Sequence, residues 1–274
     1  MILQKRDQNI LASLSRYGIL SSRQIGELFF KNIRHTTMMK RLRILEEENF
    51  ILRAKGLPDS QSAWYLGAKG AKAIGVDEPG RYTNQNIVLH EVTLSDVRLV
   101  LESIGLGEDF TTETELRRQY EWRRDDPENA TRVIPDGVFV AKASNRDHVV
   151  ALEIELQPKN HARLHKIFTE YAKMSAFARV FYVVANKEIA NLVLREWNKV
   201  RHFDRGPHIF LCLLDELKSE KDKANVWDSH FCKGQLAAIF DCKKPLLSSG
   251  ASVDEKPTHP LSKSDDQELS RQAS

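Results

Sequence analysis

The sequence has few of the residues and motifs that indicate a cofactor or a covalent mechanism. Its 274 residues include three cysteines, which are widely spaced and form no Cys-x-x-Cys pair. Neither a disulfide framework nor a zinc ribbon is therefore indicated, and a reducing, cytoplasmic location is expected. The sequence also contains no glycine-rich phosphate loop, no Gly-x-Ser-x-Gly elbow and no Cys/His nucleophile pattern. We therefore expect no nucleotide cofactor.

Long apolar runs are absent as well. No stretch reaches the roughly 20 residues that a membrane-spanning helix needs, and the first residues lack the apolar segment of a signal peptide. The length suits two domains, and the fractions of apolar residues, 41%, and of charged residues, 29%, are typical of globular proteins. The sequence predicts a soluble cytoplasmic protein that does not interact with membranes.

Charge is distributed unevenly along the chain. The net charge is only +3, but residues 1–75 contain 13 Lys/Arg against 6 Asp/Glu, so the remainder carries about −4. A basic region of this kind favours a polyanionic partner. No basic amphipathic helix with an aromatic face is present, so double-stranded DNA is a better candidate than a membrane surface.

The basic region has the pattern of a winged helix-turn-helix domain. Apolar residues at helical spacing and capping residues predict three helices, and two short extended segments follow them. The helices are predicted at 6–17, 23–30 and 35–48, and the strands at 50–54 and 63–66. This domain is assigned to residues 1–76, and the polar segment 77–86, with its Pro-Gly pair, is predicted to be a linker.

Hydroxyl and cationic side chains of the third helix lie outside or beside its apolar stripe. Such side chains reach phosphates and base edges from a helix in the major groove, and cations at the start of the wing can hold the adjacent backbone. The candidate DNA-binding residues are Thr36, Thr37, Lys40, Arg41, Arg43, Arg53 and Lys55. The alternative is a protein-docking winged helix with a solvated charged face, but the local charge surplus favours DNA.

The second half of the chain alternates helices and strands, which indicates an α/β fold with a mixed sheet. Helices are predicted at 87–104, 160–175 and 187–201, and strands at 110–117, 132–141, 148–157, 180–185 and 209–214. This domain is assigned to residues 87–244. Residues 245–274 are rich in Ser, Lys, Asp and Pro with no aromatic residue, so a disordered tail is predicted.

An acidic cluster is predicted within this sheet. Side chains alternate along a strand, so Glu153, Glu155 and Gln157 share one face, and a turn at 143–147 brings the strand beside Asp136. Three carboxylates that converge repel one another unless a cation binds them. A half-exposed strand with a solvated face is the simpler alternative, but the following helix and buried strand indicate a sheet covered on both faces. We expect Asp136, Glu153 and Glu155 to bind Mg²⁺ or Mn²⁺.

The order helix, three strands, helix, strand, with Pro135-Asp136 and Glu153/Glu155, resembles the PD-(D/E)XK phosphodiesterases. The resemblance implies metal-dependent cleavage of DNA, with Asp136 and Glu155 as the acids and Gln157 in the place of the family's lysine. A second register pairs Asp136 with Glu153 and puts Glu155 at that place. Neither register supplies a lysine there, so Lys159 or Lys166 is expected to serve, and silent copies of the fold also lack it.

Two further features accompany the acidic cluster. His90-Glu91 opens the long helix, where Glu91 is either a third acid or a first-turn residue that favours the helix dipole. The helix predicted over 160–175 has cationic residues outside its apolar stripe, which form either a second phosphate-binding surface or a solvated face. They are His161, Arg163, His165, Lys166 and Lys173.

The winged helix combined with His90, Pro135-Asp136-Gly137, Leu152-Glu153-Ile154-Glu155 and the Lys166/Tyr171 helix resembles the replication-relaxation family. The resemblance covers about residues 5–215. It implies a protein of plasmids and other mobile elements that functions in replication, relaxation or mobilisation. Such a protein is expected to be either a winged-helix-directed endonuclease or a silent DNA-binding regulator. Replication or mobilisation proteins, or a second copy of the chain, are candidate partners.

Overall fold

The computed structural model describes residues 2–54, 57, 62–77, 82, 84–107, 109–119, 133–142, 147–174, 177, 179–200, 207–228 and 233–240. All of them belong to one compact unit, Met1–Lys244. Lys55, half of the predicted linker (78–81 and 83), residues 143–146 of the predicted turn and the predicted tail lie outside the described residues.

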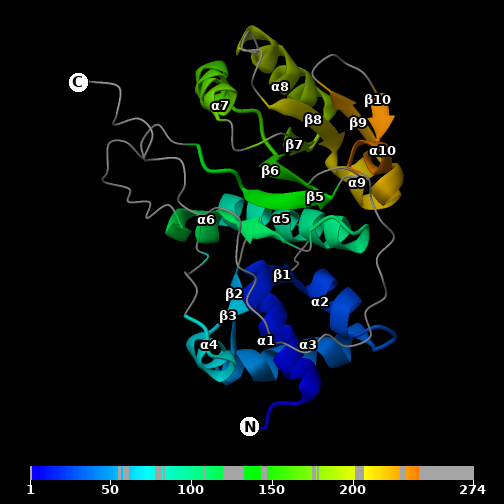
Figure 1. Cartoon of the computed structure of the whole chain (residues 1–274). Helices are drawn as coiled ribbons and strands as arrows, with labels where there is room; N and C mark the ends of the chain where they lie inside the picture. Colours follow the sequence, from blue (N-terminus) through cyan, green and yellow to red (C-terminus); the bar gives the residue numbers. More distant parts are fainter. Residues whose placement is uncertain are drawn as a thin grey trace, which may run out of the picture. The chain divides into compact units, whose positions relative to one another are not determined.

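The N-terminal region contains three helices, a small sheet and a fourth helix (Figure 1). The elements are α1 (Lys5–Tyr17), β1 (Ile19–Ser21), α2 (Ser22–Phe29), α3 (His35–Glu47), β2 (Ile51–Ala54), β3 (Ala63–Leu66) and α4 (Ala68–Ile74). The sheet has the order β1-β3-β2 with antiparallel pairs. The three predicted helices and two strands are confirmed in the order of a winged helix-turn-helix, whereas β1 and α4 were not predicted.

Local signals in the sequence explain where these helices begin and end. The Ser21 side chain accepts a hydrogen bond from the backbone N–H of Gln24, whose side chain accepts one from the backbone N–H of Ser21, which is a capping box at the start of α2. Asn49 adopts a left-handed φ of 58° just beyond α3. The apolar stripes of α1, α2 and α3 meet in one core with Trp64 of β3.

The second region is built on a seven-stranded mixed sheet. Its elements are α5 (Gln85–Ser103), β4 (Thr111–Thr112), α6 (Glu113–Gln119), β5 (Gly137–Lys142), β6 (Asp147–Glu155), α7 (His161–Lys173), β7 (Arg179–Val184), α8 (Lys187–Val200), β8 (His208–Leu213), α9 (Leu214–Glu220), the 3₁₀ turn η2 (Lys221–Lys223), β9 (Asn225–Asp228), β10 (Lys233–Gln235) and α10 (Leu236–Phe240). The strand order is β10-β9-β8-β7-β6-β5-β4, with β6, β7 and β8 parallel and the outer pairs antiparallel.

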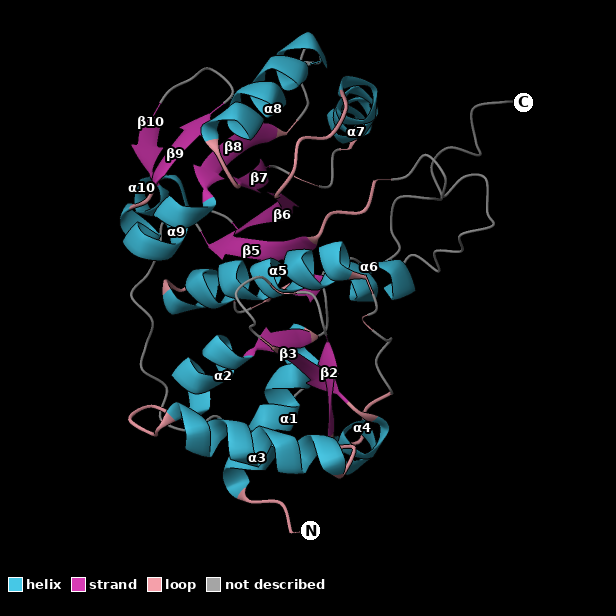
Figure 2. Cartoon of the chain, turned by 180° about the vertical axis from the view of Figure 1, so that it is seen from behind, coloured by secondary structure: helices cyan, strands magenta, loops and turns pink. Residues whose placement is uncertain are grey.

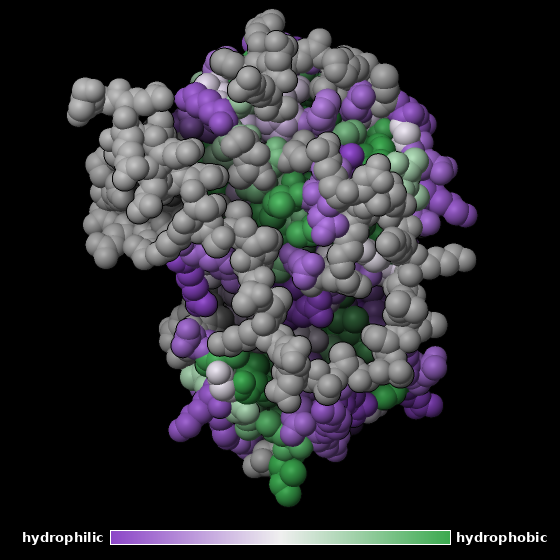
Figure 3. Space-filling model, viewed as in Figure 1, coloured by the Kyte–Doolittle hydropathy of each residue, from purple (hydrophilic) through white to green (hydrophobic). Residues whose placement is uncertain are grey.

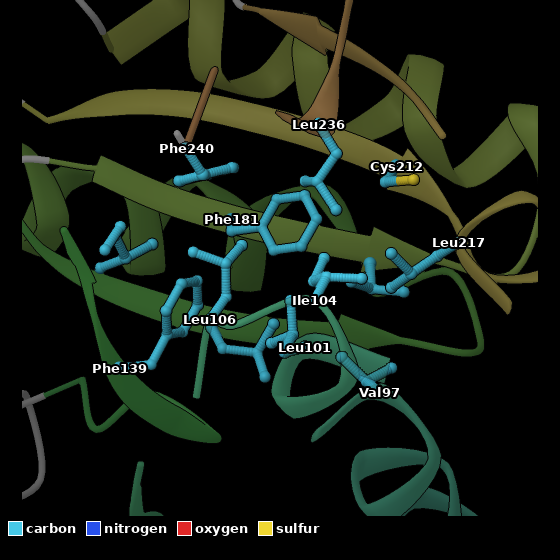
Figure 4. Close-up of a cluster of buried hydrophobic side chains, with 14 of the residues drawn as sticks. Val97, Leu101, Ile104, Leu106, Phe139, Phe181, Cys212, Leu217, Leu236 and Phe240 are labelled. Atoms are coloured by element: carbon cyan, nitrogen blue, oxygen red, sulfur yellow. The ribbon is translucent and has the colours of Figure 1, made fainter. Parts of the chain in front are cut away.

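Both faces of this sheet are covered. Side chains of α5, α9 and α10 pack on one face with Phe181 and Val183 of β7, and Figure 4 shows Phe181 among residues from these helices. Side chains of α7 and α8 pack on the other face with Tyr182 and Val184, and Figures 1 and 2 show the two helices on that side. The expectation of a doubly covered sheet with a continuously apolar central strand is confirmed. The fold class is α/β.

Helix α5 packs against both sheets. One side of it contributes Val97 and Leu101 to the core of the large sheet, and the other side contributes Val88 and Val92 to a cluster with β1 and β3. The Ser95 hydroxyl donates a hydrogen bond to the carbonyl oxygen of Ile19 at 2.8 Å. The winged-helix region is therefore packed directly on the helix that supports the large sheet.

The strand predicted at 110–117 is wrong beyond its first residues. Only Thr111–Thr112 is extended, and α6 begins at Glu113. The Thr112 hydroxyl accepts a hydrogen bond from the Glu115 backbone N–H, and the Glu115 carboxylate accepts from the Thr112 N–H at 2.7 Å. This Thr-x-x-Glu capping box starts a helix and ends the extended segment at Thr112.

Candidate functional site

Asp136 immediately precedes β5 and lies beside β6. The pair Gly137↔Leu152 starts the antiparallel register, so the next position places Asp136 opposite Glu153. Its Oδ2 accepts a hydrogen bond from the backbone N–H of Ile154 at 2.7 Å. Gly137 is needed here because an added Cβ would meet the Phe110 ring at 2.3 Å. The hairpin thus brings the first predicted acid to the strand that carries the other two.

Glu153 and Glu155 lie on the face of β6 that α7 covers, and each residue is only 6% exposed. The Tyr171 hydroxyl of α7 donates a hydrogen bond to Glu153. Burial raises the pKa of Glu153 to about 8, and the negative charges of Asp136 and Glu155 add to this, although Lys159 and Tyr171 oppose it. The three acids are therefore close enough to influence one another's ionisation, as the sequence predicted.

Lys159 supplies a lysine to this cluster. It follows β6 by four residues, pairs with Glu155 and has a side chain only 19% exposed. A cavity of about 240 Å³ lies at this point, and it is lined by Asn86, Leu89, His90, Asp136, Ile154, Glu155, Leu156, Gln157, Lys159 and Arg163. We call it the acidic pocket. Of the two lysines considered from the sequence, Lys159 lines the acidic pocket, whereas Lys166 lies on the exposed surface of α7 and does not.

His90 enters the acidic pocket from α5. Its Nε2 lies 3.2 Å from Asp136 Oδ2, and its Nδ1 lies 3.6 Å from the Glu91 carboxylate. Burial alone would lower the pKa of His90, but the hydrogen bonds and charges of Asp136 and Glu91 raise it to about 10. The raised pKa favours the charged imidazole at neutral pH, and His90 and the Ile154 amide contact the same Oδ2 of Asp136.

The donor set suits a hard divalent cation, because carboxylate oxygens are the ligands that Mg²⁺ and Mn²⁺ prefer. The raised pKa of Glu153 indicates negative charge that a bound cation would offset. Across the described ranges, however, no three His, Cys, Asp or Glu side chains already form a metal-ligand group. A cation would have to compete with Lys159 for Glu155. The carboxylates therefore suit a divalent cation chemically, but in this structure they contact His90, Tyr171 and Lys159 instead.

The predicted DNA-binding residues separate into two groups. Thr36, Thr37, Lys40 and Arg43 are exposed on α3. Arg41 instead donates hydrogen bonds to both carboxylate oxygens of the buried Asp7. Arg53 donates to the Ser62 hydroxyl at 2.9 Å and lies over the Trp64 ring. Arg41 and Arg53 therefore have structural partners within the N-terminal region.

In the view of Figure 3, hydrophilic and hydrophobic residues both appear on the N-terminal region, without one continuous hydrophobic surface. A hollow of about 510 Å³ between α2 and α3 is lined partly by Phe30, Ile33 and Met38. It contains no cluster of acids, so it does not resemble a hydrolytic site. The exposed hydroxyls and cations of α3 remain the nucleic-acid candidates.

Some residues of the acidic pocket were not predicted to take part in it. Asn86 was overlooked, although the Asn84-Gln85-Asn86 run is a recognisable helix start that places side chains at one end of α5. Tyr171 was quoted among the residues that carry the family resemblance, but its hydroxyl contact with Glu153 was missed. A buried tyrosine needs a partner for its hydroxyl, which was the available signal.

The model of the replication-relaxation family matches residues 11–202, which spans both the winged-helix region and the acidic pocket. The chain belongs to the replication-relaxation family. Membership relates it to the replication or relaxation of plasmids and other mobile elements. No curated protein and no solved structure gives a significant match. In the described part of the chain, no helix is both long and apolar enough to cross a membrane.

Proposed function

We propose that this member of the replication-relaxation family binds double-stranded DNA through α3 and nicks or cuts it at the acidic pocket with Mg²⁺ or Mn²⁺. The observation that carries the proposal is a cavity lined by Asp136, Glu155 and Lys159, with the buried carboxyl of Glu153 within electrostatic reach of all three. This combination of groups resembles the PD-(D/E)XK phosphodiesterases. Gln157 occupies the position of the lysine in those enzymes, and Lys159 would supply the lysine from two residues further along the chain.

Each residue has a role in this proposal. Asp136, Glu153 and Glu155 would hold the cation, which supplies an activated water and neutralises charge on the phosphate. The Lys159 ammonium offsets the acids and offers donors to a water or a phosphate oxygen. His90 and the Ile154 amide fix the Asp136 carboxylate by its Oδ2. Tyr171 fixes Glu153 from the covered face of the sheet.

Supercoiled plasmid tests the hydrolytic part of the proposal. With Mg²⁺ or Mn²⁺ the wild-type protein should produce nicked or linear DNA, and Asp136→Ala and Lys159→Met should lower the rate at least ~100-fold, because each removes charge from the reacting site. Lys166→Met is the matched control, since Lys166 lies outside the acidic pocket. Undiminished cleavage by Asp136→Ala would reject this site.

The second candidate is a silent DNA-binding regulator or accessory factor. It is favoured by the observation that Asp136, Glu153 and Glu155 each already contact a protein donor, namely His90, Tyr171 and Lys159. Proteins of replication or mobilisation, or a second copy of the chain, would then be its partners. Tight, salt-sensitive binding to one DNA site without any metal-dependent cleavage would favour this function.

Both candidates require DNA binding by α3. Replacing Lys40 and Arg43 with Gln should weaken binding to duplex DNA about tenfold or more and reduce the salt dependence, because each lost phosphate contact releases roughly one counterion fewer. Lys69→Gln on α4, which removes an exposed ion pair with Glu48 at the C-terminal end of α3, is the control. Fluorescence anisotropy over a salt series measures both quantities. Equal affinity of the two variants would contradict a DNA-reading role for α3.

A further inference from the structure

Three side chains with hydrogen-bond donors surround the opening of the acidic pocket. Asn86 of α5, Gln157 beyond β6 and Arg163 of α7 all line the cavity, and all three are exposed to solvent. Their side chains make no hydrogen bond or ion pair with any other residue that the structure describes. We call these three residues the rim. The rim differs from the interior of the pocket, where the acids are all engaged.

Arg163 lines the acidic pocket, unlike Lys173 and Lys199, which lie elsewhere on α7 and α8 and have acidic partners. Lys173 pairs with Glu170, and Lys199 pairs with the buried carboxylate of Glu196. Arg163 has no such partner in the described residues, although its charge is close enough to Glu155 to oppose the rise that burial causes in the pKa of that carboxyl. Its backbone N–H is fixed by the Asn160 side chain at 2.8 Å, which sets the first turn of α7. The guanidinium is thus placed at the cavity by a capped helix and left available.

The chemistry of the rim selects an anionic ligand with several oxygen acceptors. A guanidinium offers a planar pair of N–H donors that fits a phosphate, and the two amides add donors without charge. The acids inside the pocket would repel an anion that entered without a cation. One phosphate of an anionic polymer would therefore bind at the rim, where hydrogen-bond donors are most numerous. The adjacent phosphodiester of the same polymer would then face the acids inside the pocket.

We propose that Arg163, assisted by Gln157 and Asn86, binds a backbone phosphate of DNA at the mouth of the acidic pocket, independently of the contact made by α3. The identity of the ligand rests on the proposed function, which makes DNA the substrate. The contact itself does not require that the pocket hydrolyse anything. The sequence allowed a phosphate-binding role for all the cations of α7, and the proposal assigns that role to Arg163 alone.

The test compares Arg163→Gln, Arg163→Lys and the control Lys173→Gln in anisotropy titrations with duplex and single-stranded oligonucleotides, in EDTA and over a salt series. Arg163→Gln should weaken binding about five- to tenfold and lower the slope of log K against log salt by about one, the values for a single phosphate contact. Arg163→Lys should recover part of the affinity and the full slope. Lys173→Gln should change affinity less than about twofold, since Lys173 already has an acidic partner.

The outcomes separate this proposal from the hydrolytic one. If Arg163→Gln matches Lys173→Gln in affinity and slope on both oligonucleotides, the rim contact is wrong, whether or not the plasmid is cut. If wild-type protein leaves plasmid intact but Arg163→Gln still loses affinity and slope, hydrolysis fails and the rim contact stands. If the protein does cut, Arg163→Gln should raise KM while kcat changes less than about threefold.

Discussion

Two groups of carboxylates border α5, and their partners differ. Near its C-terminal half, Asp96 accepts hydrogen bonds from Arg23 at 2.6 Å and Lys218 at 2.9 Å. Glu102 accepts from Arg16 at 3.0 Å and Arg98 at 2.9 Å. We call this group the docking cluster, because Arg16 and Arg23 belong to the winged-helix region. Two acids here face four cations.

The acidic pocket at the other end of α5 has the opposite balance. Asp136 and Glu155 line it and pair with His90 and Lys159, while Arg163 at the rim pairs with neither acid. The pKa of the neighbouring Glu153 is raised, which means that its charged form is disfavoured in the fold. Carboxylates that are each paired with cations can hold secondary-structure elements together. Buried acids with too few cations around them destabilise the protein, so their presence indicates a function other than stability. The comparison therefore predicts a structural role for the docking cluster and supports the functional role proposed for the acidic pocket.

Arg98 provides the sharpest test of the docking cluster. The residue is 6% exposed, donates to Glu102 and to the carbonyl oxygen of Arg16, and lies between the rings of Tyr17 and Phe110. Arg98→Ala should lower the free energy of unfolding by about 3 kcal/mol, because the carbonyl oxygen of Arg16 loses its donor, Glu102 loses one of its donors, and the packing of a buried side chain is removed. Urea denaturation measures the change.

The control for Arg98→Ala is Lys69→Ala. It breaks the Lys69–Glu48 pair, whose side chains are 51% and 41% exposed, and should change the free energy of unfolding by less than about 0.5 kcal/mol. If the two variants lose similar amounts, the docking cluster is not structural and the comparison with the acidic pocket fails.

The sequence predicted the acidic pocket better than the docking cluster, for a physical reason. Alternation along β6 is local, so the shared face of Glu153 and Glu155 follows from adjacent residues alone. The hairpin to Asp136 spans few residues as well. Asp96 meets Arg23 across 73 positions and Lys218 across 122, and no local pattern specifies such pairs.

The same limit explains which fold elements were missed. The helices with clear apolar stripes and the buried strands of the large sheet were predictable from periodicity. β1 has only three residues and exists because β3 lies beside it, with Leu20 opposite Trp64. Likewise, only the folded chain distinguishes Lys159 from Lys166, because the distance to Glu155 depends on how the segment after β6 leads into α7.

Glu153 tests the acidic pocket through pH. A carboxyl whose pKa is raised in the fold, here to about 8 from 4.5, stabilises the protein at low pH and loses that contribution as pH rises between these values. Glu153→Gln retains an acceptor for Tyr171 but has no charge. It should therefore be more stable than wild type by about 2 kcal/mol at pH 9. Chemical denaturation from pH 5 to pH 9 measures both proteins.

The difference between the two pH profiles isolates Glu153, because other titrating groups are common to both proteins. A variant profile parallel to that of wild type, or a variant less stable at pH 9, would mean that Glu153 is ionised without penalty. The acidic pocket would then resemble the docking cluster, and its need for a cation would lose its main support.

His90 tests how the acidic pocket compensates for its excess of acid, with a smaller expected effect. Its imidazole should remain protonated at pH 8, because Asp136 and Glu91 raise its pKa to about 10 against the opposing effect of burial. Asp136→Asn should lower this pKa by at least about one unit, equivalent to ~1.4 kcal/mol.

Glu91→Gln should lower the pKa of His90 less, since the Glu91 carboxylate is 3.6 Å from the ring and that of Asp136 is 3.2 Å away. NMR titration of the imidazole carbon and nitrogen shifts gives all three values. A His90 that titrates near 6.5 in the wild-type protein would show that the imidazole is not paired with Asp136, and Lys159 alone would then balance the three acids.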